Sequence, residues 1–138
     1  AVERAGNQGE KNAIIDSSMH LAQVLQDVTV LAVPCALGSR EDAGTANGGQ
    51  QGWWGSIIPS IGSDCLAARS RGLGTAWTTL HLGGEDEVAD ALDIPSSVTQ
   101  LACIPTAFYT GDDFKIAQRK PAEQVTYWNA WKQSDIDA

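Results

Sequence analysis

Apolar residues recur along the first part of the chain with two different patterns. Between Asn12 and Asp27 they return every three or four positions, which is the spacing of one helix face. The residues of this stripe are Ile15, Met19, Ala22 and Leu25. The next segment, 28–37 (VTVLAVPCAL), is a continuous apolar run with the length of a buried strand. Because both faces of such a strand must be covered, we expect helices on either side of its sheet.

A polar, glycine-rich segment separates this strand from a second helical pattern. Residues Ser39–Gly52 (SREDAGTANGGQQG) are too many for a tight turn, and long loops in compact domains often carry function. A helix is then predicted from Ser56 to Arg71, with Gly72 as its C-terminal stop. Pro59 fits only in the first turn of this helix. The predicted apolar stripe consists of Ile58, Ile61, Cys65 and Ala68.

The second half of the chain alternates strands with one short helix. The pattern predicts strands over 75–82 (TAWTTLHL) and 98–109 (VTQLACIPTAFY). Between them, a helix over 85–92 begins with three acidic residues, which the helix macrodipole favours. Helices that alternate with strands form an α/β order, so the pattern alone favours a parallel sheet. The length of 138 residues fits one domain, 1–138.

Composition narrows the class of protein. With 43% hydrophobic and 19% charged residues, the chain resembles folded soluble proteins rather than disordered ones. A net charge of -8 disfavours nucleic acids and anionic membrane surfaces as partners. The three cysteines have no CxxC spacing, and two of them, Cys35 and Cys103, lie in apolar runs. This usage is typical of reduced, buried cysteines, so we expect a cytoplasmic protein.

The usual signatures of a self-contained active site are missing. The sequence has no GxSxG, P-loop or HExxH motif and no dense cluster of metal ligands, so we expect no metal site. Of the two histidines, His20 lies beside the apolar stripe of its helix and fits a boundary residue better than a base. His81 stands near the end of the second predicted strand, and contact with a ligand is the weaker of its two interpretations. An enzyme with so few catalytic groups of its own borrows its chemistry from a cofactor.

Three blocks of sequence resemble one protein family in order and in spacing. The first block, Gly52–Leu82, contains LAARSRGLGT, which is similar to a family helix that leads into a flavin-lining strand. The second block is Glu85–Phe114, and the third, Gln118–Trp131 (QRKPAEQVTYWNAW), resembles a terminal basic-proline motif with its tail. The segment Asp16–Gly38 also fits. On these blocks the chain resembles the C-terminal part of FMN-dependent nitroreductase-family oxidoreductases.

The resemblance implies a fold, a cofactor and an activity. The fold would be α+β, a three-layer α/β/α sandwich with a mostly antiparallel central sheet, in contrast to the parallel sheet favoured above. Such proteins are homodimers with two FMN sites at the subunit interface, and the tail 115–138 would pack on the partner. The implied activity is a two-electron reduction, in which hydride passes from NAD(P)H through FMN to a nitroaromatic, a quinone or a similar acceptor. Two alternatives stay open: a flavin-binding or storage module without turnover, and a structural remnant of the same fold.

The resemblance assigns four consecutive residues to the flavin ring. These residues are Trp77, Thr78, Thr79 and Leu80. They match the family segment that lies against the isoalloxazine, with the backbone N–H of Thr79 near flavin N5. No side chain of the protein itself would then be catalytic. The alternative interpretation is that the segment is a half-buried strand.

The resemblance also assigns residues to the flavin phosphate and to the substrate. Arg119 matches an arginine that binds the FMN phosphate, for which a guanidinium fork is well suited, and Lys120 and Lys115 would assist it. The alternative is a solvated basic turn. Trp53 and Trp54 match aromatic residues over the substrate face of the flavin. They could equally be anchors of a dimer interface.

Two departures from the family pattern change what we expect of this chain. Gly62-Ser63 stands where the family has a glutamine–asparagine pair, and a glycine inside a helix costs about 1 kcal/mol relative to alanine. The arginine–serine–arginine grip on the phosphate has no counterpart before Asn12. The chain begins AVERAGNQ, and its only methionine, Met19, lies inside a helical pattern. We therefore expect a processed, trimmed or partial chain whose domain is incomplete at the N-terminus.

Overall fold

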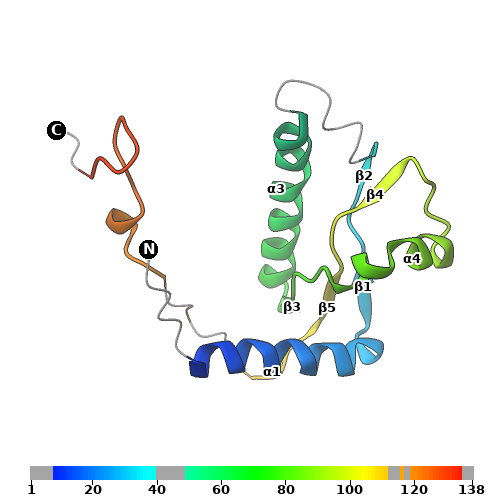
Figure 1. Cartoon of the computed structure of the whole chain (residues 1–138). Helices are drawn as coiled ribbons and strands as arrows, with labels where there is room; N and C mark the ends of the chain where they lie inside the picture. The colour runs from blue at the N-terminus through cyan, green and yellow to red at the C-terminus, as the bar shows by residue number, and fades with distance from the viewer. Residues whose placement is uncertain (1–7, 40–48, 112–115, 117–118, 135–138) are drawn as a thin grey trace.

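The computed structural model describes residues 8–39, 49–111, 116 and 119–134, with side chains from Ile15 onward. The α-helices are α1 (Gln8–Val24), α3 (Gly49–Ser70) and α4 (Glu85–Ala91). The 3-10 helices are η1 (Leu25–Asp27), η2 (Leu80–Gly84) and η3 (Ala122–Gln124). The strands are β1 (Val30–Ala32), β2 (Cys35–Leu37), β3 (Leu73–Thr75), β4 (Val98–Gln100) and β5 (Ile104–Phe108). The described part of the chain is therefore an α+β fold (Figure 1).

The strands pair antiparallel throughout the described residues. One sheet has the order β1-β5-β3, and β2 pairs with β4 in a second sheet. The antiparallel arrangement agrees with the expectation from the resemblance, and the parallel sheet favoured by the order of elements is wrong. Strands β1 and β3, which come before and after α3 in the chain, do run the same way. However, β5 lies between them and runs in the opposite direction, so every neighbouring pair is antiparallel.

The two sheets are joined by a β-bulge in the segment 98–108, which contains β4 and β5 and which we call the return strand. Ala32 pairs with Ile104, while Cys35, three residues further on, pairs with Gln100, four residues further back. Between these two pairs, the segment 101–103 has three residues and the facing segment 33–34 has two. An extra residue in one strand of an antiparallel pair defines a bulge, which bends the strand and redirects its side chains.

The bulge explains why adjacent residues of the return strand both reach the core. Side chains in a regular strand alternate between its two faces, yet consecutive Leu101 and Ala102 both belong to the buried cluster. The Leu101 N–H donates to the carbonyl of Pro34 at 2.9 Å, which keeps the two long strands together across the interruption. The predicted strands over 28–37 and 98–109 are thus both present, and each is broken once.

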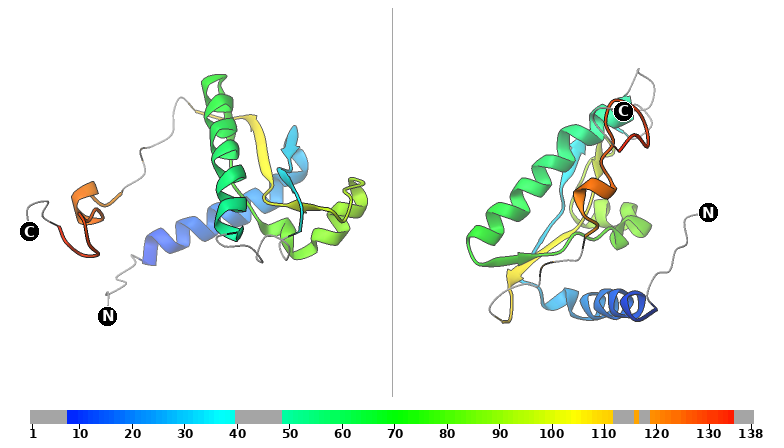
Figure 2. Two further views of the ribbon diagram at one scale, coloured as in Figure 1. Left: turned by 90° about the horizontal axis from the view of Figure 1, so that it is seen from above. Right: turned by 90° about the vertical axis from the view of Figure 1, so that its left-hand side faces the viewer.

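The core lies between α3 and the strands. Its buried residues are Ile61, Leu101, Ala102 and Ile104, and the residues packed against them are Ala32, Ala36, Trp54, Ile57 and Cys65. The members from α3 are spaced three or four apart and form one helix face. Ile58, which the pattern placed on this face, is 44% exposed, so that prediction is wrong. Figure 2 (right) shows α3 on one side of the strands and α1 with α4 on the other.

The helix α3 begins at Gly49 rather than at the predicted Ser56, and this places Pro59 in the helix interior. A proline lacks the N–H that would bond the carbonyl four residues earlier, here that of Gly55. Both residues are exposed, so water can bond that carbonyl. The prediction that Pro59 lies in the first turn is wrong. The remainder of the predicted loop, 40–48, lies outside the described residues.

The helix α1 is confirmed, but the rest of the described chain covers little of it. Ile15 is 59% exposed and Met19 is 58% exposed, although the pattern placed both on a buried stripe. In β1, Val30 and Leu31 are also exposed. The expectation that both faces of this strand are covered is therefore wrong for the described residues. No helix in this part of the chain combines the length and the apolarity required to cross a lipid bilayer.

Candidate functional site

The segment Trp77–Leu80 continues from the edge of the three-stranded sheet. The strand β3 ends at Thr75, but Thr78 still bridges Cys103 in the same antiparallel register. The Thr78 N–H donates to the Cys103 carbonyl at 3.1 Å, and the Cys103 N–H donates to the Thr78 carbonyl at 2.8 Å. The pairing stops there because the return strand bulges at this point. From Leu80 the chain is a 3-10 helix, so the predicted strand over 75–82 is wrong in its last residues.

The four residues assigned to the flavin ring lie together in the structure. Trp77, Thr78, Thr79 and Leu80 line a hollow of about 240 Å³ with Ser18 and Leu21 of α1, which we call the Thr79 hollow. The Leu80 side chain is 72% exposed, as expected of a residue at an open rim. The sequence did not single out the two residues of α1. Leu21 lies four residues before Leu25, the first residue of η1, and this apolar spacing could have shown which side of the helix faces the strands.

Thr79, one of the residues that line the Thr79 hollow, has a backbone donor that no described residue uses. The N–H of Thr78 is used by Cys103, and the N–H of Leu80 meets the Thr78 hydroxyl oxygen at 3.4 Å. The Thr79 N–H, by contrast, finds no hydrogen-bond partner among the residues that the structure describes. Thr79 is an exposed residue, so water can bond this N–H when no ligand is present. The Thr79 N–H is therefore available to a ligand.

A second hollow of about 300 Å³ lies along the same segment, and we call it the His81 hollow. Its lining residues are Leu21, Ala22, Leu25, Thr78, Leu80, His81 and Cys103. Both ring nitrogens of His81 are buried without a hydrogen-bond partner in the described residues. Burial lowers the pKa of His81, while Glu85 acts on it in the opposite direction. Burial raises the pKa of the Cys103 thiol, so this thiol is not an activated nucleophile.

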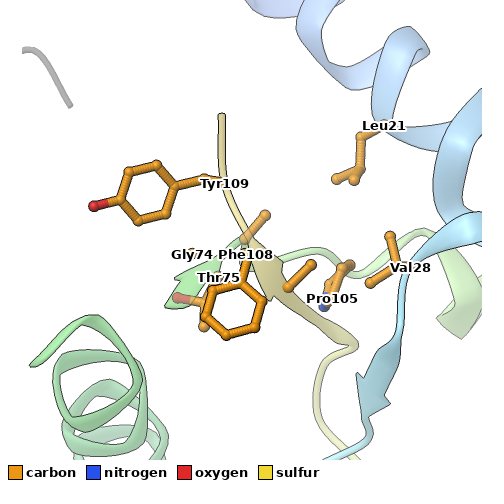
Figure 3. Close-up of a pocket in the computed structure, with 9 residues that line it drawn as sticks. Leu21, Val28, Gly74, Thr75, Pro105, Phe108 and Tyr109 are labelled. Atoms are coloured by element: carbon orange, nitrogen blue, oxygen red, sulfur yellow. The ribbon is translucent and has the colours of Figure 1, made fainter. Parts of the chain in front are cut away.

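A third hollow, of about 210 Å³, opens at the edge of the sheet (Figure 3). Leu21 and Val28 lie on one side of it, and Pro105 and Phe108 lie on the other (Figure 3). Leu21 therefore lines all three hollows. This arrangement shows that α1 lies against the strands with gaps along its length rather than in close packing.

Trp53 and Trp54 lie near the start of α3 and do not line the Thr79 hollow. The Trp53 ring N–H donates to the Leu37 carbonyl at 3.1 Å. The two rings meet edge to face with centroids 4.7 Å apart, and Trp54 packs against the core. Within one chain both residues thus make structural contacts, a role that the sequence did not indicate. Their assignment to a substrate pocket stays a prediction.

Replacing Trp53 with phenylalanine tests this structural role. The change keeps an aromatic ring but removes the donor to the Leu37 carbonyl, so we expect a loss of about 0.5–1.5 kcal/mol in the free energy of unfolding. Chemical denaturation followed by circular dichroism measures it. Leu66→Ala, at a side chain of the same helix that is 73% exposed, is the control and should change stability less. An unchanged midpoint for the phenylalanine variant would contradict the role.

Arg119 and Lys120 are exposed and do not line the Thr79 hollow either. The segment that follows them, with η3 in orange, lies apart from the strands in Figure 1 and in the left view of Figure 2. Lys115 lies outside the described residues. The tail displays large apolar side chains: Trp131 is 81% exposed and meets Tyr127 edge to face with centroids 5.0 Å apart. A single chain therefore does not bring the predicted phosphate ligands to the predicted ring site.

The described residues contain no group of three histidine, cysteine, aspartate or glutamate side chains placed to hold a metal ion. All three cysteines are free. No protein-family model matches the chain, and no curated protein matches it.

Proposed function

We propose that the chain is the C-terminal part of an FMN-dependent two-electron reductase with a nitroreductase-like sandwich fold. It would pass hydride from NAD(P)H through FMN to a nitroaromatic, a quinone or a similar acceptor. The observation that carries the proposal is the unpaired Thr79 N–H, at a hollow lined by the four residues that the resemblance assigns to the flavin ring. A donor to flavin N5 tunes the atom that accepts hydride, and the protein's part in flavin chemistry is largely such tuning and orientation.

The Thr79 hollow fits part of FMN rather than all of it. Pockets for cofactor-sized ligands usually have about 300–1,000 Å³, and this hollow has about 240 Å³. In the proposal, Trp77 and Leu80 supply apolar walls for the ring, and Thr79 supplies its backbone donor. FMN, when bound, supplies the redox chemistry. The phosphate would be held elsewhere, by Arg119 with Lys120.

A second copy of the chain would complete the site. Uncovered apolar side chains mark interfaces, and α1 and the tail both display them. Examples are Ile15 and Met19 on α1, and Ile116, Val125 and Trp131 in the tail. In the proposal, the tail packs on the partner and brings Arg119 of one copy to the Thr79 hollow of the other. This arrangement would join the ring and phosphate residues that one chain keeps apart.

A flavin-binding module without turnover is the second candidate. The observation in its favour is that no acidic, basic or histidine side chain lines the Thr79 hollow, so the described residues supply no such proton donor to an acceptor there. It differs from the first candidate in one respect only, the absence of hydride transfer.

Direct observation of bound flavin tests the proposal. Purified protein is mixed with excess FMN and passed over a gel-filtration column, and the protein peak is examined for flavin absorbance. We expect yellow protein that elutes as a dimer and oxidises NAD(P)H when a nitroaromatic or quinone is added. Yellow protein without oxidation would favour the binding module. Colourless protein at high FMN concentration would overturn both candidates for this chain.

Ser18→Trp should block the Thr79 hollow from the side of α1. Ser18 lines the hollow, so a large ring there would occupy space needed by the flavin. We expect FMN affinity to fall about tenfold or more, a change of about 1.4 kcal/mol or more. Ser17→Trp is the matched control, since Ser17 is exposed on the same helix but does not line the hollow. Titration of flavin fluorescence compares the two; equal affinities would place the ring elsewhere.

A further inference from the structure

His81 is held in an unusual position for a titratable side chain. It lies in the short 3-10 helix η2, between α4 and the segment that lines the Thr79 hollow. Neither ring nitrogen is reached by solvent, and neither has a hydrogen-bond partner among the described residues. For an uncharged imidazole, leaving a buried ring nitrogen without a partner costs only the desolvation of a neutral polar group. A charged imidazolium carries two donors, and burying a charge without a partner costs far more.

The neighbours of His81 offer little to a positive charge. The N-terminal helices contribute only apolar residues to the His81 hollow: Leu21 and Ala22 from α1, and Leu25 from η1. The return strand contributes the Cys103 thiol, which burial keeps uncharged at neutral pH. From α4, the carboxylate of Glu85 attracts the proton, but the Gln100 N–H already donates to its Oε1 at 3.2 Å. The effect of burial on the pKa of His81 is larger than the opposite effect of Glu85.

We infer that His81 is an acid-sensitive contact that holds η2 in place while its ring is uncharged and releases it on protonation. The charged ring must leave its enclosed position to reach water, and the adjacent His81 hollow gives it room to turn. Because Leu80 begins η2 and lines both hollows, movement of η2 also changes the wall of the Thr79 hollow. The inference holds whether or not the chain binds flavin. Where it does, binding would weaken in acid.

The direction of the pH effect follows from proton binding in the two states. The unfolded chain takes up the proton at the ordinary histidine pKa of about 6.5, whereas burial keeps the folded chain unprotonated to lower pH. Between these two pKa values, the form in which His81 has left its buried position binds more protons than the form in which η2 is held in place. The stability of the latter form is therefore complete above the ordinary histidine pKa and is lost as the pH falls below it.

Hydrogen exchange tests the inference in the intact chain. Amide protection of a peptide covering 78–84 is measured at pH 7.5 and 5.5 and corrected for intrinsic exchange. We expect wild-type protection to fall, by at most about tenfold for each pH unit, the limit for one proton. His81→Phe should remove this fall, whereas His20→Phe, an exposed histidine on α1, should retain it. Equal losses in the wild type and in His81→Phe, or no loss in the wild type, would overturn the inference.

A second measurement covers the case in which His81→Phe does not fold. The ring protons of His81 are followed by NMR in the wild-type chain during an acid titration, in the folded state and in urea. We expect the folded ring to titrate at a lower pH than the ring in urea, with amide shifts in 78–84 that follow the same curve. Titration at the same pH in both states, or amide shifts that do not follow it, would contradict the inference.

Discussion

Replacing Ile61 with alanine is expected to lower the free energy of unfolding by about 2–5 kcal/mol, the usual cost of such a truncation in a core. Ile61 is 5% exposed and is the only fully buried residue that α3 contributes among the described residues. It packs with Ile104 and Leu101 at the centre of the cluster. Domains are commonly stable by only about 5–15 kcal/mol, so the variant would lose a large part of its stability. Urea unfolding followed by circular dichroism measures the change.

Ile58→Ala is the matched control for this experiment. It removes the same atoms from the same helix, three residues earlier, but from a side chain that is 44% exposed. We expect it to cost less than about 1 kcal/mol. The pair also tests the orientation of α3 about its axis. If the two variants lose similar amounts, the helix presents a different face to the strands from the one described.

Replacing Arg119 with alanine should weaken FMN binding by about 10- to 100-fold. This range corresponds to the roughly 1.5–3 kcal/mol of a hydrogen bond to a charged group. Arg71→Ala removes an equal charge at the end of α3, where the guanidinium bonds the Ala67 carbonyl, and should leave FMN affinity unchanged. Flavin fluorescence titration compares the variants. Equal affinity of the Arg119 variant and the wild type would remove this arginine from the phosphate site.

Mixing two defective variants tests whether Arg119 acts on the partner subunit. One subunit carries Arg119→Ala, and the other carries Ser18→Trp, which blocks its own Thr79 hollow. If Arg119 serves the partner, a mixed dimer keeps one intact site, so random mixing should restore about a quarter of all sites. If Arg119 serves its own chain, each mixed dimer has no intact site, and mixing restores none.

Local sequence patterns predicted the helices well because helix periodicity depends on near neighbours. The helices α1 and α4 appear within a few residues of their predicted bounds. The orientation of α3 was wrong at Ile58 because Ile57 and Ile58 are equally apolar and adjacent. Only the packing partner decides which of them is buried, and that partner, the return strand, lies about forty residues away in sequence.

The pairing of distant strands and the residues of the candidate site could not be predicted from sequence patterns as well as the helices could. The bridge between Thr78 and Cys103 and the bulge beside it lie in runs where every residue is compatible with a strand. The resemblance selected the four residues that line the Thr79 hollow, which periodicity could not. It gave no indication of Ser18, because the approach of α1 to that segment depends on the whole fold. It placed Arg119 beside the same ligand, and one chain does not bring the two together.

The bulge in the return strand has a consequence for the kinds of sequence change that this chain can accept. Substitutions at 101–103 alter one side chain each. Deleting one residue there would leave two residues facing Val33 and Pro34, so β4 would keep its partners in β2 and the bulge would disappear. The bulge is what lets the adjacent Leu101 and Ala102 both reach the core, and in a regular strand neighbouring side chains point to opposite faces. The length of this segment therefore sets how many of its side chains enter the core, whereas the pairing of β4 with β2 does not depend on it.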